Sequence, residues 1–273
     1  MIKRLKTALF VPTEIINMRV DSFGLVFVYL LLLAFIMMIP ACIKVARFDK
    51  ISFDNRVIIQ AAFKDEEIPF TIVDNKLTAT SDVLLSDYYI DNDFMVTLSL
   101  KEVSAPTKKT MYRIVFTESE VSIYYYLNGS NVTSLPMFKY EEYDELTNIN
   151  LKHAASEENY DFWNDIFNVA NKEIKKYIPY LTIGVAIGYT FANLVIMLAI
   201  ALLLTLVQRM MTRRIISFKE NYVIASYALS PMVVSGLLSQ LFSLRFIYFI
   251  GIILAIIYNM IATNQLLSNR DRN

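Results

Sequence analysis

The residues that most often bind zinc or act as nucleophiles are scarce in this chain, which has a single histidine, His153, and a single cysteine, Cys42. A zinc site needs several such ligands, and His153 lies in a polar stretch with neither a second histidine nor a thiol beside it. We therefore interpret His153 as a solvated side chain. A lone cysteine also excludes a disulfide within the chain. The sequence thus predicts no catalytic residue, no metal site and no cofactor.

The sequence also lacks the longer motifs of enzyme chemistry. It has no phosphate loop, dinucleotide fingerprint or kinase signature, so any ATP hydrolysis would have to come from a partner protein. Two tyrosine runs, 88–89 and 124–126, could line a glycan-binding or peptide-binding surface, because aromatic rings offer contact area at a small entropic cost. Side chains alternate along a strand, however, which would divide each run between core and solvent. We favour this structural interpretation for both runs.

Four long apolar segments in the sequence determine how the rest of the chain can be arranged. The chain is 55% hydrophobic with a mean hydropathy of +0.42, and its uncharged stretches each reach the roughly 20 residues that cross a bilayer. We expect an α+β membrane protein with four transmembrane helices and an extracytoplasmic β-rich domain inserted between helices 1 and 2. The predicted organisation is a cytoplasmic amphipathic and basic segment at 1–20, helix 1 at 21–46, the β-rich domain at 47–155, an amphipathic helix at 156–177, helix 2 at 178–208, a basic cytoplasmic loop at 209–220, helix 3 at 221–244, helix 4 at 246–267 and a cytoplasmic tail at 268–273.

The distribution of charge along the chain predicts how the protein is oriented in the membrane. Residues 49–176 hold 22 acidic and 13 basic residues, a net charge of −9, whereas the rest of the chain holds 4 acidic and 13 basic residues, a net charge of +9. Because Lys and Arg near span ends stay in the cytoplasm, we expect both termini to be cytoplasmic and residues 47–177 to lie outside the cell membrane. Lys44, Arg47 and Arg245 would lie on the outer side and oppose this rule, but ten other basic residues support it. The basic residues that support it are Lys3, Arg4, Lys6, Arg19, Arg209, Arg213, Arg214, Lys219, Arg270 and Arg272.

The basic loop allows two interpretations. Arg209, Arg213, Arg214 and Lys219 either bind anionic lipid or serve only to fix the orientation, which is the interpretation we favour. The four uncharged stretches contain no ionisable Asp, Glu, Lys, Arg or His, and Asp21, Glu220 and Arg245 at their edges are interpreted as boundary markers.

Small residues and one proline mark the spans themselves. Gly184, Gly188 and Ala192 recur on one helix face, and Ser235 and Ser239 recur on another. Rows of this kind allow close helix packing, although small residues also recur by chance in apolar helices. Pro231 is expected to kink the third span and to free a backbone acceptor that a neighbour must satisfy.

The middle of the chain changes to a period of two. Residues 68–79 predict a hairpin that turns at Asp74-Asn75, and residues 111–117 and 121–127 predict a second one. Phe94, Val96 and Leu98 predict a strand with one buried face, in a sheet of five or six strands. From residue 156 the spacing of Tyr160, Trp163, Phe167 and Ala170 is typical of an amphipathic helix. Near the start, residues 1–20 predict either a helix on an anionic membrane surface, broken at Pro12, or simply a basic flank.

Several of these segments together resemble a known family. Leu5–Pro12 with Arg19, the Ile39-Pro40 pair, Ile68–Leu77 and Tyr227–Pro231 resemble the bacterial membrane family catalogued as domain of unknown function 1189. The resemblance spans nearly the whole chain. It implies a low-GC Gram-positive bacterium, a link to maltodextrin utilisation through the name that some members carry, and a distant similarity to the Yip family. It implies no catalytic residue.

The function expected from these patterns is that of a non-enzymatic membrane accessory or sensor, whose extracytoplasmic domain binds a partner or ligand and is linked, through the resemblance, to carbohydrate (maltodextrin) uptake. One alternative is a transport component for a sugar or lipid, and a second is a membrane-embedded enzyme. The expected partners are the lipid bilayer and either a membrane protein or a second copy of the chain, without nucleic acid.

Overall fold

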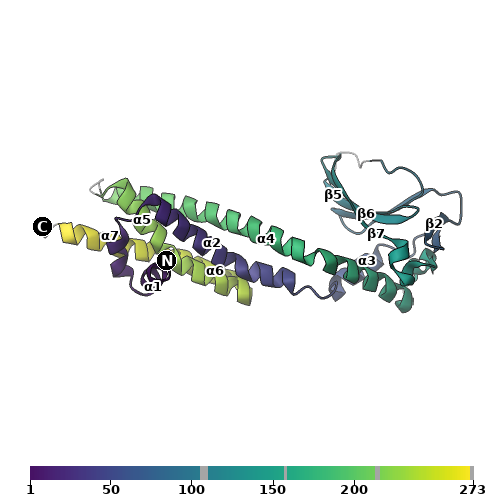
Figure 1. Cartoon of the computed structure of the whole chain (residues 1–273), viewed down its shortest axis with the longest axis horizontal. Helices are drawn as coiled ribbons and strands as arrows, with labels where there is room; N and C mark the ends of the chain where they lie inside the picture. Colours follow the sequence, from purple (N-terminus) through teal and green to yellow (C-terminus); the bar gives the residue numbers. More distant parts are fainter. Residues whose placement is uncertain (105–109, 157–158, 213–215, 271–273) are drawn as a thin grey trace. The chain divides into compact units, whose positions relative to one another are not determined.

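The chain divides into two compact units that are described separately. The computed structural model describes residues 1–104, 110–156, 159–212 and 216–270 (Figure 1). One unit, the membrane unit, comprises Met1–Phe48 and Ile178–Asn273. The other, the sheet unit, comprises Asp49–Tyr177.

Helices build the membrane unit. They are α1 Ile2–Phe10, the 3-10 helix η1 Pro12–Met18, α2 Phe23–Ala46, the later part of α4 Tyr160–Met211, α5 Phe218–Ala228, α6 Ser230–Phe242 and α7 Arg245–Arg270. Within the described residues, four helical segments are long and apolar enough to cross a membrane: Phe23–Ala46, Tyr160–Met211, Phe218–Phe242 and Arg245–Ser268. The prediction of a multi-pass α+β membrane protein is confirmed at this level.

The N-terminal segment packs on the helices of its own unit. α1 ends at Phe10 and Pro12 stands in the first turn of η1, so the predicted break is present. Ala8 is fully buried, and the hydroxyl of Tyr258 on α7 donates a hydrogen bond of 2.9 Å to the carbonyl oxygen of Leu9. The segment is therefore an integral part of the helical unit.

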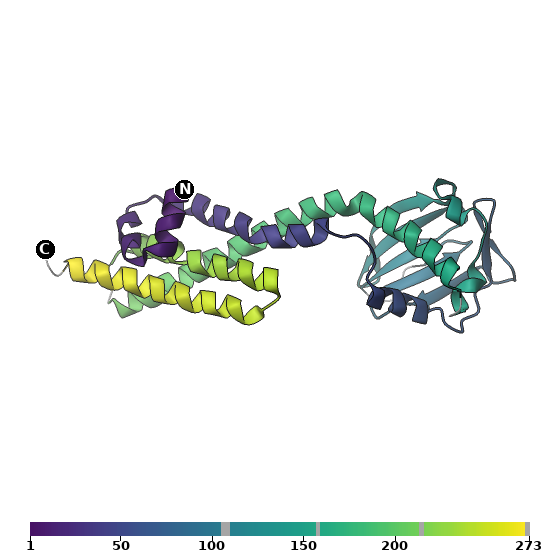
Figure 2. The same ribbon diagram turned by 90° about the horizontal axis from the view of Figure 1, so that it is seen from below.

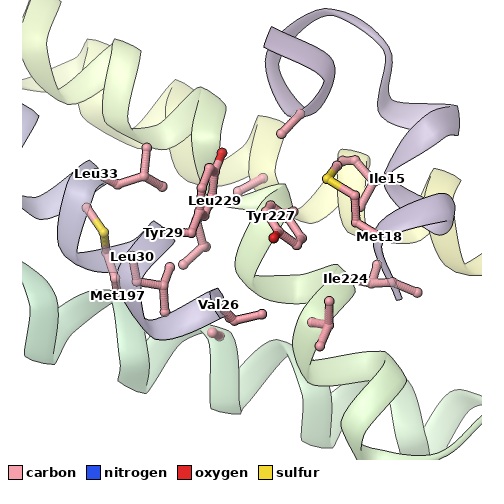
Figure 3. Packing of buried hydrophobic residues seen from close by; sticks show 14 of the residues in the cluster. Ile15, Met18, Val26, Tyr29, Leu30, Leu33, Met197, Ile224, Tyr227 and Leu229 are labelled. Carbon is pink, nitrogen blue, oxygen red and sulfur yellow. The ribbon is translucent and has the colours of Figure 1, made fainter. Parts of the chain in front are cut away.

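The core of the membrane unit is drawn in Figure 3, where side chains of α2 face those of the α5–α6 segment. Ser22 caps α2 by accepting a hydrogen bond of 3.3 Å from the amide of Leu25. About two turns further along α2, the ring centroids of Tyr29 and Tyr227 lie 4.5 Å apart. Met197 of α4 packs in the same cluster, so that α2, α4 and α5 share one core.

The sheet unit contains eight strands in the described residues, and they form two sheets where one sheet of five or six strands was predicted. A three-stranded sheet has the order β2-β1-β8, and a five-stranded sheet has the order β3-β4-β5-β6-β7. Every pairing is antiparallel except the parallel pair β4–β5. The strands are β1 Phe70–Val73, β2 Lys76–Ala79, β3 Leu85–Tyr89, β4 Phe94–Ser99, β5 Met111–Phe116, β6 Glu120–Leu127, β7 Ser130–Lys139 and β8 Ile149–Asn150.

Helices complete the sheet unit. Three short 3-10 helices lie near the end of the unit: η2 Tyr140–Glu142 and η3 Asp144–Leu146 stand between β7 and β8, and η4 Leu151–Ala155 follows β8. Helix α3 Phe53–Ala61 precedes them. Figure 2 shows α3 and the first turns of α4 lying across one face of the five-stranded sheet. The predicted amphipathic helix at 156–177 corresponds to the start of α4 at Tyr160, while residues 157–158 lie outside the described residues.

Both predicted hairpins are confirmed. β1 and β2 join at Asp74 and Asn75, whose φ values of 47° and 63° are those of a type I′ turn. Asp and Asn tolerate this left-handed conformation better than most residues, which explains their presence here. β5 and β6 form the second hairpin.

The prediction of a single buried face on β4 is wrong. Val96 and Leu98 are buried on one face, but Met95, Thr97 and Ser99 on the other face are at most 1% exposed. Thr97 can be buried because its hydroxyl donates to Asp87 and accepts from Nε of Arg113. Polar side chains thus occupy a buried face because they form hydrogen bonds with one another, and hydrophobic periodicity does not reveal this pattern.

Candidate apolar binding site

A cavity of about 250 Å³ lies inside the sheet unit, between the helices and the five-stranded sheet. Residues from α3, β4, β5, β6, β7 and α4 contribute to its wall. The lining residues are Ile51, Ile59, Phe63, Ile68, Phe94, Val96, Leu98, Ile114, Phe116, Val121, Met137, Phe138, Leu146, Leu151, Ala154, Phe162, Trp163, Ile166, Phe167, Val169, Ala170 and Ile174.

Local periodicity explains why these residues point inward. On β4, every second residue, Phe94, Val96 and Leu98, lines the cavity, as the alternation of a strand requires. On α4, Ile166 and Ala170 stand one turn apart and repeat the spacing of a helix face. The sequence identified these faces as core, but it gave no sign that a space remains between them.

The chemistry of the wall is uniformly apolar. In the described part of the chain, no lining side chain carries a nitrogen or oxygen atom except Trp163 with its indole N–H. An engineered apolar cavity of about 150 Å³ is already large enough to bind benzene. The site therefore suits an apolar molecule larger than benzene.

Trp163 is the only tryptophan in the chain and lies in the wall of the cavity. Its ring stacks on Phe167 with centroids 5.4 Å apart and meets the edge of Phe162 at 5.4 Å. The sequence placed Trp163 and Phe167 on the buried face of the helix, and both are buried. The fluorescence of this indole can therefore report whether a molecule occupies the cavity.

A polar cluster lies beside the cavity wall on α4, at Glu173, which stands in the sequence between the lining residues Ala170 and Ile174. Glu173 is only 1% exposed, and its Oε1 accepts hydrogen bonds from the hydroxyl of Tyr143 and, at 2.5 Å, from Nζ of Lys176. Burial raises the pKa of Tyr143, and its bond to Glu173 raises it further, while the Glu173 carboxylate raises the pKa of Lys176. The ring of Tyr143 meets Phe138, a residue of the cavity wall, edge-on at 5.3 Å.

The predicted packing residues of the membrane unit separate into two groups. Ser235 on α6 is buried against Gly251 of α7, where a methyl group in place of the glycine hydrogen would lie 2.5 Å from the Ser235 Cβ. Ser239, one turn later, is half-buried. Gly184, Gly188 and Ala192 instead form an exposed face of α4. A Cβ on either glycine would meet no heavy atom of the described residues within 4 Å, so close helix packing at this face stays a prediction.

Pro231 stands in the first turn of α6, just after an interruption of the helix at Leu229. A continuous helix would need an amide at position 231, which proline lacks. The chain therefore breaks into α5 and α6 instead of bending within one helix. The Ser230 hydroxyl donates a hydrogen bond of 2.6 Å to the carbonyl oxygen of Tyr227.

The basic loop is described only in part. Arg213 and Arg214 lie outside the described residues. The guanidinium of Arg209 lies 5.8 Å from the ring centroid of Phe218, and Lys219 is exposed. Neither position decides between lipid binding and orientation, and both interpretations stay open.

Asp21, interpreted from the sequence as a boundary marker, joins three segments. Arg4 of α1 donates two hydrogen bonds to its carboxylate, at 2.9 and 3.0 Å, and the hydroxyl of Tyr227 on α5 donates a third at 2.7 Å. The hydrogen bonds from Arg4 are the main cause that lowers the pKa of Asp21. Sequence reasoning separated these residues because a gap of 206 positions lies between Asp21 and Tyr227.

The comparisons with known proteins decide the family. The model of a family described as protein of unknown function (DUF1189) matches residues 2–263. The chain belongs to this DUF1189 family. The match covers both the membrane unit and the sheet unit, and the resemblance seen in the sequence is confirmed, while the distant likeness to the Yip family stays a prediction. No curated protein and no solved structure shows a significant match.

Proposed function

We propose that this DUF1189 protein is a non-enzymatic membrane accessory or sensor, whose sheet unit lies outside the cell membrane and binds an apolar ligand. The cavity of about 250 Å³ carries this proposal. Ligand sites are commonly concave, largely preformed and lined by hydrophobic and aromatic side chains, as this one is.

The lining favours a lipid-like tail over a carbohydrate. A maltodextrin presents many hydroxyl groups, and each one buried without a hydrogen bond costs about 1–3 kcal/mol. In the described wall, the indole N–H of Trp163 is the only side-chain group that could serve them. An alkyl chain gains about 0.8 kcal/mol for each methylene group that it buries. We therefore propose an apolar ligand even if the protein acts in carbohydrate uptake.

A binding role suits this wall better than a catalytic one. General acid–base and nucleophilic catalysis need an ionisable or nucleophilic side chain next to the bound molecule. The described lining consists of aliphatic, aromatic and thioether side chains. The site can hold a molecule and exclude water from it, and a bound molecule would be reported to the membrane helices or to a membrane-protein partner.

The charge distribution supports the outer placement of the sheet unit. The acidic residues gather in 49–176, and basic residues flank the four spans. A ligand would then reach the cavity from outside the cell, as expected for a sensor or for an accessory of an uptake system.

Quenching of Trp163 fluorescence tests the proposal, because bromine quenches tryptophan on contact and the chain has no second tryptophan. The full-length protein in lipid nanodiscs is titrated with 1-bromodecane, a ten-carbon chain with a terminal bromine. We expect saturable quenching in the wild type and its loss in Ala170→Leu, because leucine fills space in the cavity wall.

The matched control is Ala61→Leu, the same substitution at an exposed position of α3. It should quench like the wild type. Quenching that does not saturate, or that persists unchanged in Ala170→Leu, would show that the cavity does not bind the probe.

A further inference from the structure

We infer that helix α3 lies in the membrane interface, with the side chains of Phe53, Val57 and Ile58 inserted at the boundary between the lipid head groups and the acyl chains. The inference goes beyond the proposed function and does not depend on whether the cavity holds a ligand. It depends on three features of the chain: the apolar outer side of α3, the short connection from α2, and the hydrogen bonds that tie the segment before α3 to α4.

Helix α3 carries apolar residues on two opposite sides. On the inner side, Ile59 lines the cavity. On the outer side, Phe53, Val57 and Ile58 are exposed by 78%, 45% and 49%. Phe53 and Val57 stand four residues apart, and the exposed Ala61 follows Val57 by four residues and Ile58 by three. Because residues at these spacings are neighbours on a helix surface, the four side chains form one apolar patch.

This patch needs an apolar environment. A helix of nine residues is too short to be stable in water by itself, so it depends on what its faces contact. The inner side packs in the cavity wall, whereas the outer side stays exposed in the described chain. Asp54, a charged residue of the exposed side, stands in the first turn, where the helix dipole favours a carboxylate. The remaining exposed patch has the composition of a helix that lies in a membrane interface.

The chain keeps this patch within reach of the bilayer. Helix α2 ends at Ala46, and Phe53 follows seven residues later, a segment that spans at most about 25 Å when it is fully extended. Lys44 and Arg47 stand at the end of α2. Long basic side chains at the ends of spans extend to the level of the head groups. The segment that leads to α3 therefore starts at the bilayer surface.

Two hydrogen bonds fix the segment before α3 close to that surface. The amide of Ile51 donates a hydrogen bond of 2.8 Å to Oδ1 of Asn171, and Nζ of Lys175 donates one of 2.8 Å to Oδ1 of Asp49. Asn171 stands six residues before Tyr177, which corresponds to at most about 9 Å along α4. The apolar stretch of α4 starts with the residue after Tyr177. An interfacial helix buries its apolar face about 5–10 Å deep at the head-group boundary, a depth that α3 can reach from this position.

The bilayer fits the patch better than a second copy of the chain does. A helix of nine residues is about 14 Å long and about 10 Å wide. A stable interface between proteins buries about 800 Å² on each partner, far more than such a face offers. Insertion into lipid requires no matching surface, and each copy of the chain meets the bilayer through its spans.

Quenching by lipids that carry a nitroxide near the head group tests the inference in full-length protein in nanodiscs. In a Cys42→Ser background, Val57→Cys is labelled with the environment-sensitive fluorophore NBD. The matched control is Val132→Cys, which replaces a valine of β7 that is exposed by 55% in the same unit. We expect quenching at position 57 to be at least threefold stronger than at position 132. Quenching at position 57 that is no stronger than at position 132 would overturn the inference.

Iodide in the surrounding water separates lipid from protein as the cover of the patch. A label at position 57 that is shielded both from iodide and from the nitroxide lipid would be covered by protein, for example by a second copy of the chain. This result would also overturn the inference. None of these measurements involves the cavity, so a negative result leaves the proposed function standing.

A charge variant tests whether the apolar patch causes the contact. With the label on Ala61→Cys, Val57→Glu should reduce nitroxide quenching at least threefold, because a carboxylate disfavours insertion. Val132→Glu should leave the quenching unchanged, and equal effects of the two variants would contradict the inference. Unchanged fluorescence of Trp163 shows that the sheet unit keeps its fold in either variant. If Val57→Glu alters that fluorescence, the comparison of Val57→Cys with Val132→Cys decides.

Discussion

The hydroxyl of Ser230 donates a hydrogen bond of 2.6 Å to the carbonyl oxygen of Tyr227, the oxygen that an amide at position 231 would bind in a continuous helix. Because Ser230 gives its only proton to this carbonyl, the hydroxyl of Tyr29, 2.5 Å from the Ser230 Oγ, is the donor in their shared hydrogen bond. One side chain thus replaces the bond lost at Pro231 and ties α2 to the break between α5 and α6.

Ser230→Ala should destabilise the helical unit by about 1–3 kcal/mol, because it leaves both the Tyr227 carbonyl and the Tyr29 hydroxyl buried without this partner. Denaturant unfolding in detergent, followed by helical circular dichroism, measures the change. Ser239→Ala removes a half-buried hydroxyl from the same helix and should cost less. Equal losses in the two variants would contradict a special role for Ser230.

Gly251→Ala and Gly184→Ala should differ sharply although the substitution is identical. At Gly251 the new methyl group would lie 2.9 Å from the backbone Cα of Met232, so α6 and α7 must separate, at a cost of about 1–3 kcal/mol. At Gly184 no heavy atom of the described chain lies within 4 Å. We expect a lower melting temperature in detergent only for Gly251→Ala. A comparable loss for Gly184→Ala would indicate that its face packs on another chain.

The stability of the membrane unit should fall in acid because of Asp21. Its pKa is lowered in the folded state, mainly by the hydrogen bonds from Arg4, so the unfolded state binds more protons. The stabilisation is complete above the ordinary value of 3.8 and is lost as the pH falls below it towards the folded pKa. Melting in detergent from pH 7 to 3 should show a steeper loss for the wild type than for Asp21→Asn. The exposed Glu14→Gln should follow the wild type.

The orientation can be tested by labelling engineered cysteines on intact cells with a membrane-impermeant maleimide. In a Cys42→Ser background, a cysteine at exposed Ser130 of β7 should react, and one at exposed Thr13 of η1 should react only after the cells are opened. The reason for this expectation is the flanking positive charge, which should hold residues 1–20 in the cytoplasm. Labelling in the opposite sense would show that the sheet unit, with its cavity, lies on the cytoplasmic side.

Signals confined to a few neighbouring residues were read correctly from the sequence. The spans follow from the length of uncharged apolar runs, and the break at Pro12 follows from a missing amide. The turn at Asp74-Asn75 follows from the conformations that these two residues tolerate.

Three strands, β3, β7 and β8, were not predicted from the sequence, and β7 and β8 carry weak local patterns. β7 is exposed along most of its length and contains Pro136, which is tolerated because β7 is the edge strand of its sheet. β8 has only two residues, and it exists because Thr71 and Ile72, far away in the sequence, offer it a partner. Neither strand alternates between buried and exposed residues over enough positions to be predicted.

The sequence by itself therefore determined the class of protein, the four candidate spans, the family and the faces of β4 and α4 that turn inward. Only the tertiary structure decided that a cavity lies between those faces, that Oε2 of Glu173 lacks a partner in the described chain, and that Asp21 meets Arg4 and Tyr227. The physical reason is that periodicity specifies which side of an element is buried. The space that remains there, and the hydrogen bonds that form, depend on side chains that other elements bring to the same place.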